Sequence, residues 1–89
     1  MTYEVVMTPR AVRSLEKVPR KYHGAIFDFI FGALADNPRR VGGSLTGVFD
    51  GSYSARRGSY RILFDIDEDQ STVIVYRISH RSTAYRPPR

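Results

Sequence analysis

The stretch Ser54-Ala-Arg-Arg-Gly-Ser-Tyr-Arg-Ile-Leu-Phe-Asp-Ile66 decides the fold of this chain. Its second half alternates in side-chain character, which is typical of a β-strand with one buried face. A guanidinium is costly to bury without an anionic partner, so Arg61 should face an open, concave surface. The alternation therefore predicts a strand with two different faces. One face carries Tyr60, Ile62, Phe64 and Ile66, and the other carries Arg61, Leu63 and Asp65.

The segments on either side of this strand predict the remaining elements. Thr8 is suited to cap a first helix that begins at Pro9, and Pro19 ends that helix. The sequence Asp36-Asn-Pro38 stops a second helix, which begins near Arg20. Strands are expected at residues 3–8, 49–57, 60–66 and 72–79, with a loop at 39–47 and a hairpin turn at 67–70.

This order of strand, helix, helix and three strands favours a small single α+β domain spanning residues 1–89. We expect an antiparallel-rich sheet with the helices packed on one face, which leaves the other face for function. The side chains expected to point inward are Val12, Leu15 and Val18 from the first helix and Tyr22, Ala25, Ile26, Phe29, Ile30, Ala33 and Leu34 from the second.

The composition indicates an acidic partner. Fourteen Lys+Arg against nine Asp+Glu give the 89 residues a formal charge of +5. Only Lys17 and Lys21 are lysines, and the planar fork of arginine binds phosphate in a bidentate way and stacks on bases. RNA, DNA or an acidic protein segment would fit this charge, and so would a solvated basic surface without a partner.

The sequence contains no cysteine and no long apolar run. A chain without cysteine has no disulfide framework and no thiolate zinc site, which agrees with a reducing compartment. The apolar run at residues 29–35 is broken by Gly32 and is far too short to span a membrane. A strand pattern, and not a signal peptide, follows Met1. We therefore expect a cytoplasmic protein with no membrane partner.

Three aspartates, Asp65, Asp67 and Asp69, imitate the start of a calcium-binding loop. The sixth position of such a loop requires glycine and the twelfth requires glutamate, but Gln70 and Tyr76 stand there. An acidic, solvated turn is the better interpretation.

The two histidines, His23 and His80, are far apart in the sequence, and no cysteine accompanies them. We therefore expect no metal and no cofactor. His23 is expected on a helix surface. His80 stands beside Arg81 and is a candidate for proton transfer.

The strongest functional signal combines the arginines before and within the central strand with a second cluster, His80-Arg-Ser-Thr-Ala-Tyr-Arg86. Cleavage of a phosphodiester by its neighbouring 2′-hydroxyl needs in-line positioning, stabilised charge on the five-coordinate phosphorus and help with the protons. Arginines can supply the first two, and a tyrosine or histidine can supply the third or stack on a base. The same residues also suit nucleic-acid binding without cleavage. The constellation comprises Arg56, Arg57, Arg61, Arg81 and Tyr85.

These segments resemble the RelE/ParE superfamily of bacterial toxins from type II toxin-antitoxin systems, and the RelE branch most of all. The resemblance covers nearly the whole chain. It rests on the order of elements, on Leu45 with the following Gly-x-x-Ser-Ala-Arg-Arg-Gly-Ser-Tyr-Arg-Ile-Leu-Phe, and on the closing Ile-Ser-His-Arg-Ser-Thr-Ala-Tyr-Arg. Its most specific parts are Gly58-Ser-Tyr-Arg61 and His80-Arg81 with Tyr85.

The resemblance implies a metal-independent endoribonuclease that cuts messenger RNA in the ribosomal A site. Arg61 and Arg81 would contact the scissile phosphate, and Tyr85 would stack on or orient the substrate. Two basic residues usually stand on the preceding strand of the family, where this chain has Ser54 and Arg56.

The first of those two basic groups is therefore missing, which leaves the general base open. Arg57 and His80 are the candidates to compensate.

The resemblance also implies partners. They are a cognate antitoxin, the ribosome with its mRNA, and operator DNA reached only through the antitoxin complex. Two alternatives remain open: a ParE-type inhibitor of DNA gyrase with the same fold, which needs none of the arginine cluster, and a non-catalytic nucleic-acid-binding or co-repressor module.

Overall fold

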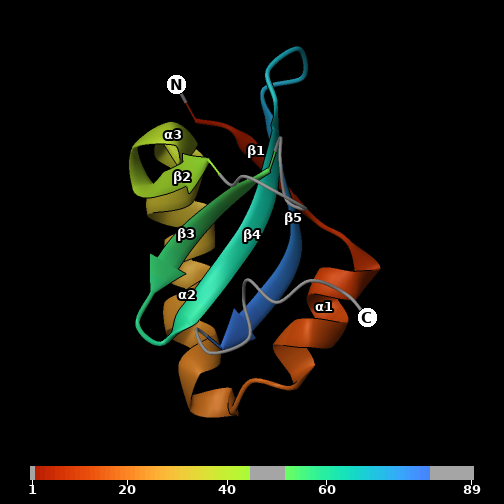
Figure 1. The fold of residues 1–89 in the computed structure, drawn as a ribbon, viewed down its shortest axis with the longest axis vertical. Coiled ribbons are helices and arrows are strands. Elements are labelled where there is room, and N and C mark those ends of the chain that lie inside the picture. Colours follow the sequence, from red (N-terminus) through yellow and green to blue (C-terminus); the bar gives the residue numbers. More distant parts are fainter. Residues whose placement is uncertain (1, 45–51, 81–89) are drawn as a thin grey trace.

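The computed structural model describes residues 2–44 and 52–80, whose strands form one mixed, mostly antiparallel sheet (Figure 1). The order across the sheet is β1-β5-β4-β3-β2. β1 runs parallel to β5, and the other neighbouring pairs are antiparallel. The strands are β1 (Glu4–Met7), β2 (Gly42–Ser44), β3 (Tyr53–Arg57), β4 (Tyr60–Asp67) and β5 (Thr72–His80).

The helices follow the expected signals closely at their starts. The Thr8 hydroxyl accepts the backbone N–H of Ala11 at 3.1 Å, and Pro9 begins α1, as predicted. The second predicted helix is divided into a 3₁₀ turn, an α-helix and a π-helical turn. The helical elements are α1 (Pro9–Glu16), η1 (Arg20–Tyr22), α2 (His23–Phe29), η2 (Ile30–Leu34) and α3 (Pro38–Val41).

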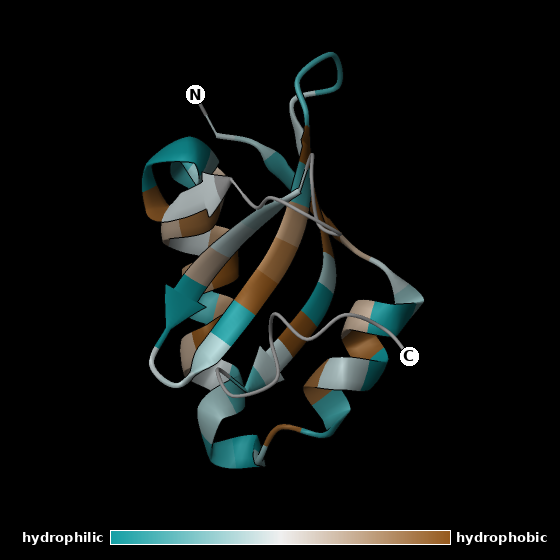
Figure 2. Ribbon diagram, viewed as in Figure 1, coloured by the Kyte–Doolittle hydropathy of each residue, from teal (hydrophilic) through white to brown (hydrophobic). Residues whose placement is uncertain are grey.

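The core lies between the helices and one face of the sheet. Figure 2 shows apolar segments along β4 and β5, the strands that contribute most of its sheet residues. The alternation predicted for the central strand is confirmed, because Tyr60, Ile62, Phe64 and Ile66 all belong to this core. The helices contribute Ala11, Leu15, Val18, Ile26, Ile30 and Leu34, and β5 contributes Val73, Val75 and Ile78.

The expected inward faces of the helices need correction. Val12 is 46% exposed because Ala11 and Leu15 are the α1 residues turned to the sheet. Tyr22 is 41% exposed, and Ala25 and Ala33 are exposed as well. A stripe of full helical width was predicted, but the narrower set of Ile26, Ile30 and Leu34, spaced by four residues, is fully buried.

The prediction of a loop over residues 39–47 is wrong for its described part. Asn37 caps a short helix by accepting the backbone N–H of Arg40, and β2 follows directly. Gly42 allows this edge strand to lie against the core, since a Cβ there would stand 2.6 Å from Cζ of Phe64.

The edge of β5 is covered by two different elements. β1 pairs with residues 72–75 of β5, and α1 lies beside the remainder of the strand (Figure 1). The Ser14 hydroxyl accepts the backbone N–H of Ile78 at 2.9 Å and donates to the carbonyl of Ala11 at 2.8 Å. One serine therefore satisfies a strand donor and fixes the helix to the strand.

The far end of the sheet is held by a cluster of Tyr3, Arg39, Tyr53 and Glu68, here named the Glu68 cluster. The Tyr3 hydroxyl donates to Oε1 of Glu68 at 2.7 Å, and Nε of Arg39 donates to Oε2 at 2.8 Å. Arg39 also donates to the hydroxyl of Tyr53 at 3.1 Å. The hydrogen bonds from Tyr3 and Arg39 lower the pKa of the Glu68 carboxyl, and this cluster links β1, α3, β3 and the β4–β5 hairpin.

Candidate functional site

The sheet face opposite the core carries a row of basic and hydroxyl side chains, here named the open face. Antiparallel pairing brings Arg56 of β3 directly opposite Arg61 of β4, and Arg61 directly opposite Ser79 of β5. The adjacent row pairs Ser54 with Leu63 and Leu63 with Arg77. Since residues directly opposite one another share a face, the six residues lie together.

A β-bulge determines which β5 residues reach the open face. Leu63 pairs with Arg77 but Phe64 pairs with Val75, so Tyr76 has no direct partner on β4. The bulge reverses the alternation, so that Val75 and Ile78 both face the core. Arg77 is thereby placed diagonally from Arg61, at the roughly 7–8 Å Cα separation usual for such neighbours.

Several side chains of the open face are buried, although the sequence predicted an exposed surface there. Leu63 is fully buried although it does not belong to the core beneath the helices, and Ser54 and Ser79 are buried at 8% and 7% exposure. Arg56 is exposed, whereas Arg61 is half-buried. The arginines therefore surround a floor of apolar and hydroxyl groups.

This geometry favours an anionic ligand. Arg56 and Arg61 are direct neighbours across β3 and β4, so their guanidiniums can reach one anion together. A phosphate bound between them would accept charge-assisted hydrogen bonds from both. The arrangement can bind a phosphodiester and stabilise charge that develops on it.

Two predicted residues lie elsewhere. Arg57 and His80 are both in register with Tyr60, whose ring belongs to the core face. The His80 ring lies edge-on to Tyr60 with 5.5 Å between centroids. Arg57 and His80 line one pocket with Tyr60, and His80 also borders a groove with Arg77. Their role in RNA binding stays a prediction.

The remaining predicted site residues, Arg81 and Tyr85, lie outside the described part of the chain. So does Leu45, which the sequence pattern included.

Sequence reasoning overlooked two groups of cations. The first is Arg77, which the β5 bulge turns to the open face, and no local sequence signal marks a bulge. The second is on α1, where Arg10, Arg13 and Lys17 border a groove together with Arg77. A signal existed there, because a spacing of three and four residues puts side chains on one side of a helix.

The described residues hold no group of three or more His, Asp or Glu side chains arranged to bind a metal ion. His23, expected on a helix surface, is half-buried, and its Nε2 donates to the carbonyl of Val18 at 2.7 Å. In residues 2–44 and 52–80, no helix is long and apolar enough to cross a membrane.

A layer of helices on one side of a five-stranded sheet, with arginines on the opposite face, defines a small α+β protein with a basic sheet surface. Comparison with known proteins identifies its class. The family model described as "ParE toxin of type II toxin-antitoxin system, parDE" matches residues 5–85. The chain therefore belongs to the RelE/ParE family of type II toxins, and its curated relatives are toxins of the RelE kind.

Two Mycobacterium tuberculosis proteins are among these relatives. Toxin RelG is 43% identical over 97% of this chain and 99% of its own length, and Toxin RelE is 40% identical over 94% and 87%. The solved toxin-antitoxin complex RelBE2 from the same organism matches with a TM-score of 0.87 at 42% identity, covering 91% of this chain and 100% of the matched chain. The intact RelBE complex of E. coli matches with a TM-score of 0.70 at 15% identity, covering 88% and 95%, and shows the shared fold alone.

Proposed function

We propose that this toxin is a metal-independent endoribonuclease that cuts mRNA on the ribosome and so inhibits translation. The observation that carries the proposal is the direct opposition of Arg56 and Arg61 on the open face, with Arg77 diagonal to Arg61. Guanidiniums in this arrangement supply the positive charge that phosphodiester cleavage requires. The proposed substrate puts the activity in the cytoplasm.

In the proposed reaction, the 2′-oxygen of one nucleotide attacks the adjoining phosphorus and the bond from phosphorus to the 5′-oxygen breaks. The 2′-proton passes to a base, and the leaving 5′-oxygen takes up a proton. The upstream fragment then ends in a 2′,3′-cyclic phosphate and the downstream fragment begins with a 5′-hydroxyl. Arg61 and Arg56 hold the non-bridging oxygens and stabilise the charge that grows on them. In this proposal Arg81 is a further phosphate contact and Tyr85 orients or stacks on the substrate.

The position of the candidate general bases relative to the open face supports a reaction that depends on the ribosome. Arg57 and His80, the candidates for general base, lie in register with Tyr60 on the other side of the sheet. In residues 2–44 and 52–80, the open face brings together several cations and few proton acceptors, and such a site gains most from a substrate already held in line. The A site of the ribosome would provide that geometry.

We further infer that a cognate antitoxin holds the toxin inactive, and that operator DNA is reached only through their complex. Support comes from relatives, since the M. tuberculosis relative with 42% identity was solved as a toxin-antitoxin complex.

Inhibition of DNA gyrase is the second candidate function, and one observation favours it: the matching family model is that of ParE toxins. A gyrase inhibitor would not need opposed arginines on a free sheet face.

Expression of the toxin in bacteria separates the two candidates. Growth arrest should be accompanied by cuts within translated mRNAs, while plasmid supercoiling stays normal. The variant Arg61→Ala, folded to the same extent by circular dichroism, should abolish both the cuts and the arrest. Loss of supercoiling with intact mRNA would refute the proposal, and so would full toxicity of the folded Arg61→Ala variant.

A further inference from the structure

A second basic surface lies beside the open face, between α1 and β5. This groove has a volume of about 550 Å³. Its charged lining consists of Arg10 and Arg13 from α1, Lys17 at the C-terminal cap of that helix, and Arg77 from β5. No carboxylate is among its described lining residues. Four cations around one groove make it a site for a polyanion.

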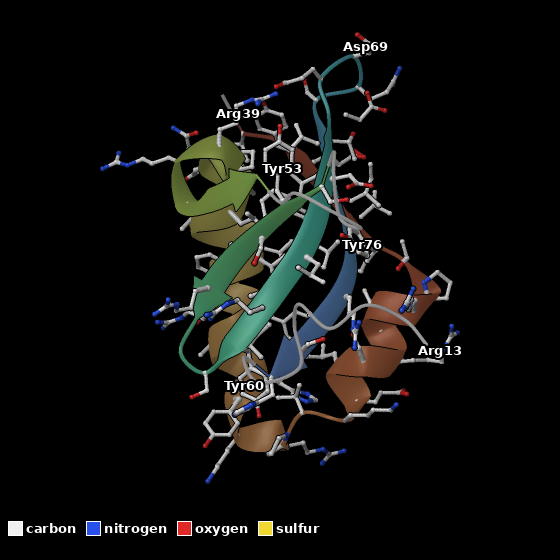
Figure 3. All side chains as sticks on the ribbon, in the orientation of Figure 1. Arg13, Arg39, Tyr53, Tyr60, Asp69 and Tyr76 are labelled. Atoms are coloured by element: carbon white, nitrogen blue, oxygen red, sulfur yellow. The ribbon has the colours of Figure 1, made fainter. Side chains whose placement is uncertain are left out.

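The groove ends at an aromatic pocket. Tyr60 and His80 line both the groove and a neighbouring pocket of about 390 Å³, and Tyr22 and Arg57 are among the other residues that line this pocket. Figure 3 shows Tyr60 and Arg13 toward the same end of the molecule, away from Arg39 and Tyr53. The ring centroids of Tyr22 and Tyr60 are 5.6 Å apart, and Tyr22 is 41% exposed. The Lys21 ammonium lies 5.2 Å from the centre of the Tyr22 ring, and an exposed aromatic ring with a cation near it is suited to bind a nucleobase and its phosphate.

We propose that the groove and pocket, together named the flank groove, bind single-stranded RNA next to the cleaved linkage. Backbone phosphates lie along Arg10, Arg13 and Lys17, and one unstacked base lies on Tyr22. This inference rests on the proposed function and extends its RNA-binding surface beyond the open face. Arg77 joins the two surfaces, since it belongs to the open face and also lines the groove.

The chemistry of the flank groove favours single-stranded RNA over other polyanions. A duplex keeps its bases stacked on one another and would leave the aromatic pocket unused. A peptide of acidic residues alone would satisfy the four cations but has no aromatic ring to stack in the pocket that Tyr22 and Arg57 line. Single-stranded RNA supplies both a regular row of phosphates and a base that can leave the stack.

A short single-stranded RNA with 2′-O-methyl groups tests the proposal, because the blocked 2′-oxygen cannot attack and binding is measured apart from cleavage. Fluorescence anisotropy at several salt concentrations gives the affinity and its salt dependence. Arg13→Gln and Lys17→Gln should each weaken binding and reduce the slope of log K against log salt by about 0.7, the value for one phosphate on a single strand. The matched control is Arg40→Gln, which removes an exposed arginine of α3 outside the groove and should change neither.

The pocket is tested by a pair of substitutions at Tyr22. Tyr22→Leu should weaken binding about tenfold with the salt slope unchanged, because stacking carries no ionic contact, and Tyr22→Phe should retain wild-type affinity. Melting temperatures of all variants establish that they are folded.

The proposal is overturned if the wild-type toxin does not bind the RNA at low salt, or if the Arg40→Gln control loses as much affinity as the groove variants. Equal affinity for duplex RNA, or binding of a poly-glutamate peptide in place of RNA, would also overturn it. Cleavage does not enter these measurements. A toxin that binds as predicted but cuts no mRNA would refute the proposed function alone, and one that cuts without this binding would refute the flank groove alone.

Discussion

Substitution of Gly42 tests how tightly the edge strand β2 is packed against the core. A Cβ at this position would stand 2.6 Å from Cζ and 3.0 Å from Cε1 of Phe64, and 3.1 Å from the carbonyl oxygen of Pro38, where ordinary contact begins at 3.4 Å. Phe64 cannot move aside easily, because it is fully buried and its ring stacks on Tyr53 at 5.7 Å. Gly42→Ala therefore overpacks the core.

The size of the effect follows from two opposing terms. Overpacking costs about 1–3 kcal/mol, and the lower chain entropy of unfolded alanine offsets about 0.4–1 kcal/mol of this. The net loss of about 0.6–2 kcal/mol should lower the melting temperature by roughly 2–16 °C, at the 4–8 °C per kcal/mol usual for chains of this size. The next residue supplies a matched control, since a Cβ at Gly43 meets nothing within 4 Å.

Gly43→Ala should therefore leave the protein as stable as the wild type or raise its melting temperature by a few degrees. Thermal and urea unfolding followed by circular dichroism measures both variants. The packing argument fails if Gly42→Ala is no less stable than the wild type, or if the two substitutions shift stability alike.

Three further predictions concern the site and the fold. Arg56→Gln should reduce mRNA cleavage about 10²-fold, as for loss of one charge-stabilising donor. The melting temperature should not fall, because Arg56 is exposed, and a parallel fall in stability would contradict the assignment. Hydrogen bonds from Tyr3 and Arg39 lower the pKa of the Glu68 carboxyl. Their contribution to the free energy of unfolding is therefore fully present above the ordinary pKa of glutamate, and it is lost as the pH falls through the lowered pKa. Glu68→Gln should thus be less stable than the wild type in urea unfolding at neutral pH, and the difference should shrink in acid. A difference that persists in acid would show that the Glu68 carboxylate is not what these hydrogen bonds stabilise. Ser14→Ala leaves the backbone N–H of Ile78 in β5 without its acceptor and should lower the free energy of unfolding by about 1–3 kcal/mol. An unchanged urea midpoint would show that this hydrogen bond is dispensable.

Local sequence signals were sufficient for most of the fold. The alternation of β4 and the Thr8 cap depend on residues that are close in sequence, so the sequence alone reveals them. β2 carries no such signal, because Gly42–Ser44 is a three-residue strand without apolar alternation, and it is identified only by its pairing with β3. More helix residues were predicted to be buried than the structure buries. Helical spacing shows which apolar residues share one side of a helix, but it does not show which of them contact the sheet.

The candidate site was predicted in part. Arg56 and Arg61 share a face because β3 and β4 are joined by a tight turn at Gly58, which adopts φ +60° and thereby fixes their register. Arg77 and Ser79 reach the open face because the bulge at Tyr76 reverses the alternation of β5 after Val75. A bulge depends on the partner strand, so no reading of β5 alone could have located it.

Cleavage of mRNA on programmed ribosomes is the most direct test of the proposed activity. Purified toxin is incubated with ribosomes that hold a defined codon in the A site, and both ends of the cut are identified chemically. The account predicts cuts at that codon, with a 2′,3′-cyclic phosphate or its 3′-phosphate product upstream and a 5′-hydroxyl downstream. Cuts should be far slower on the same mRNA without ribosomes and absent with Arg61→Ala. Intact mRNA under these conditions, or fragments that begin with a 5′-phosphate, would contradict the account.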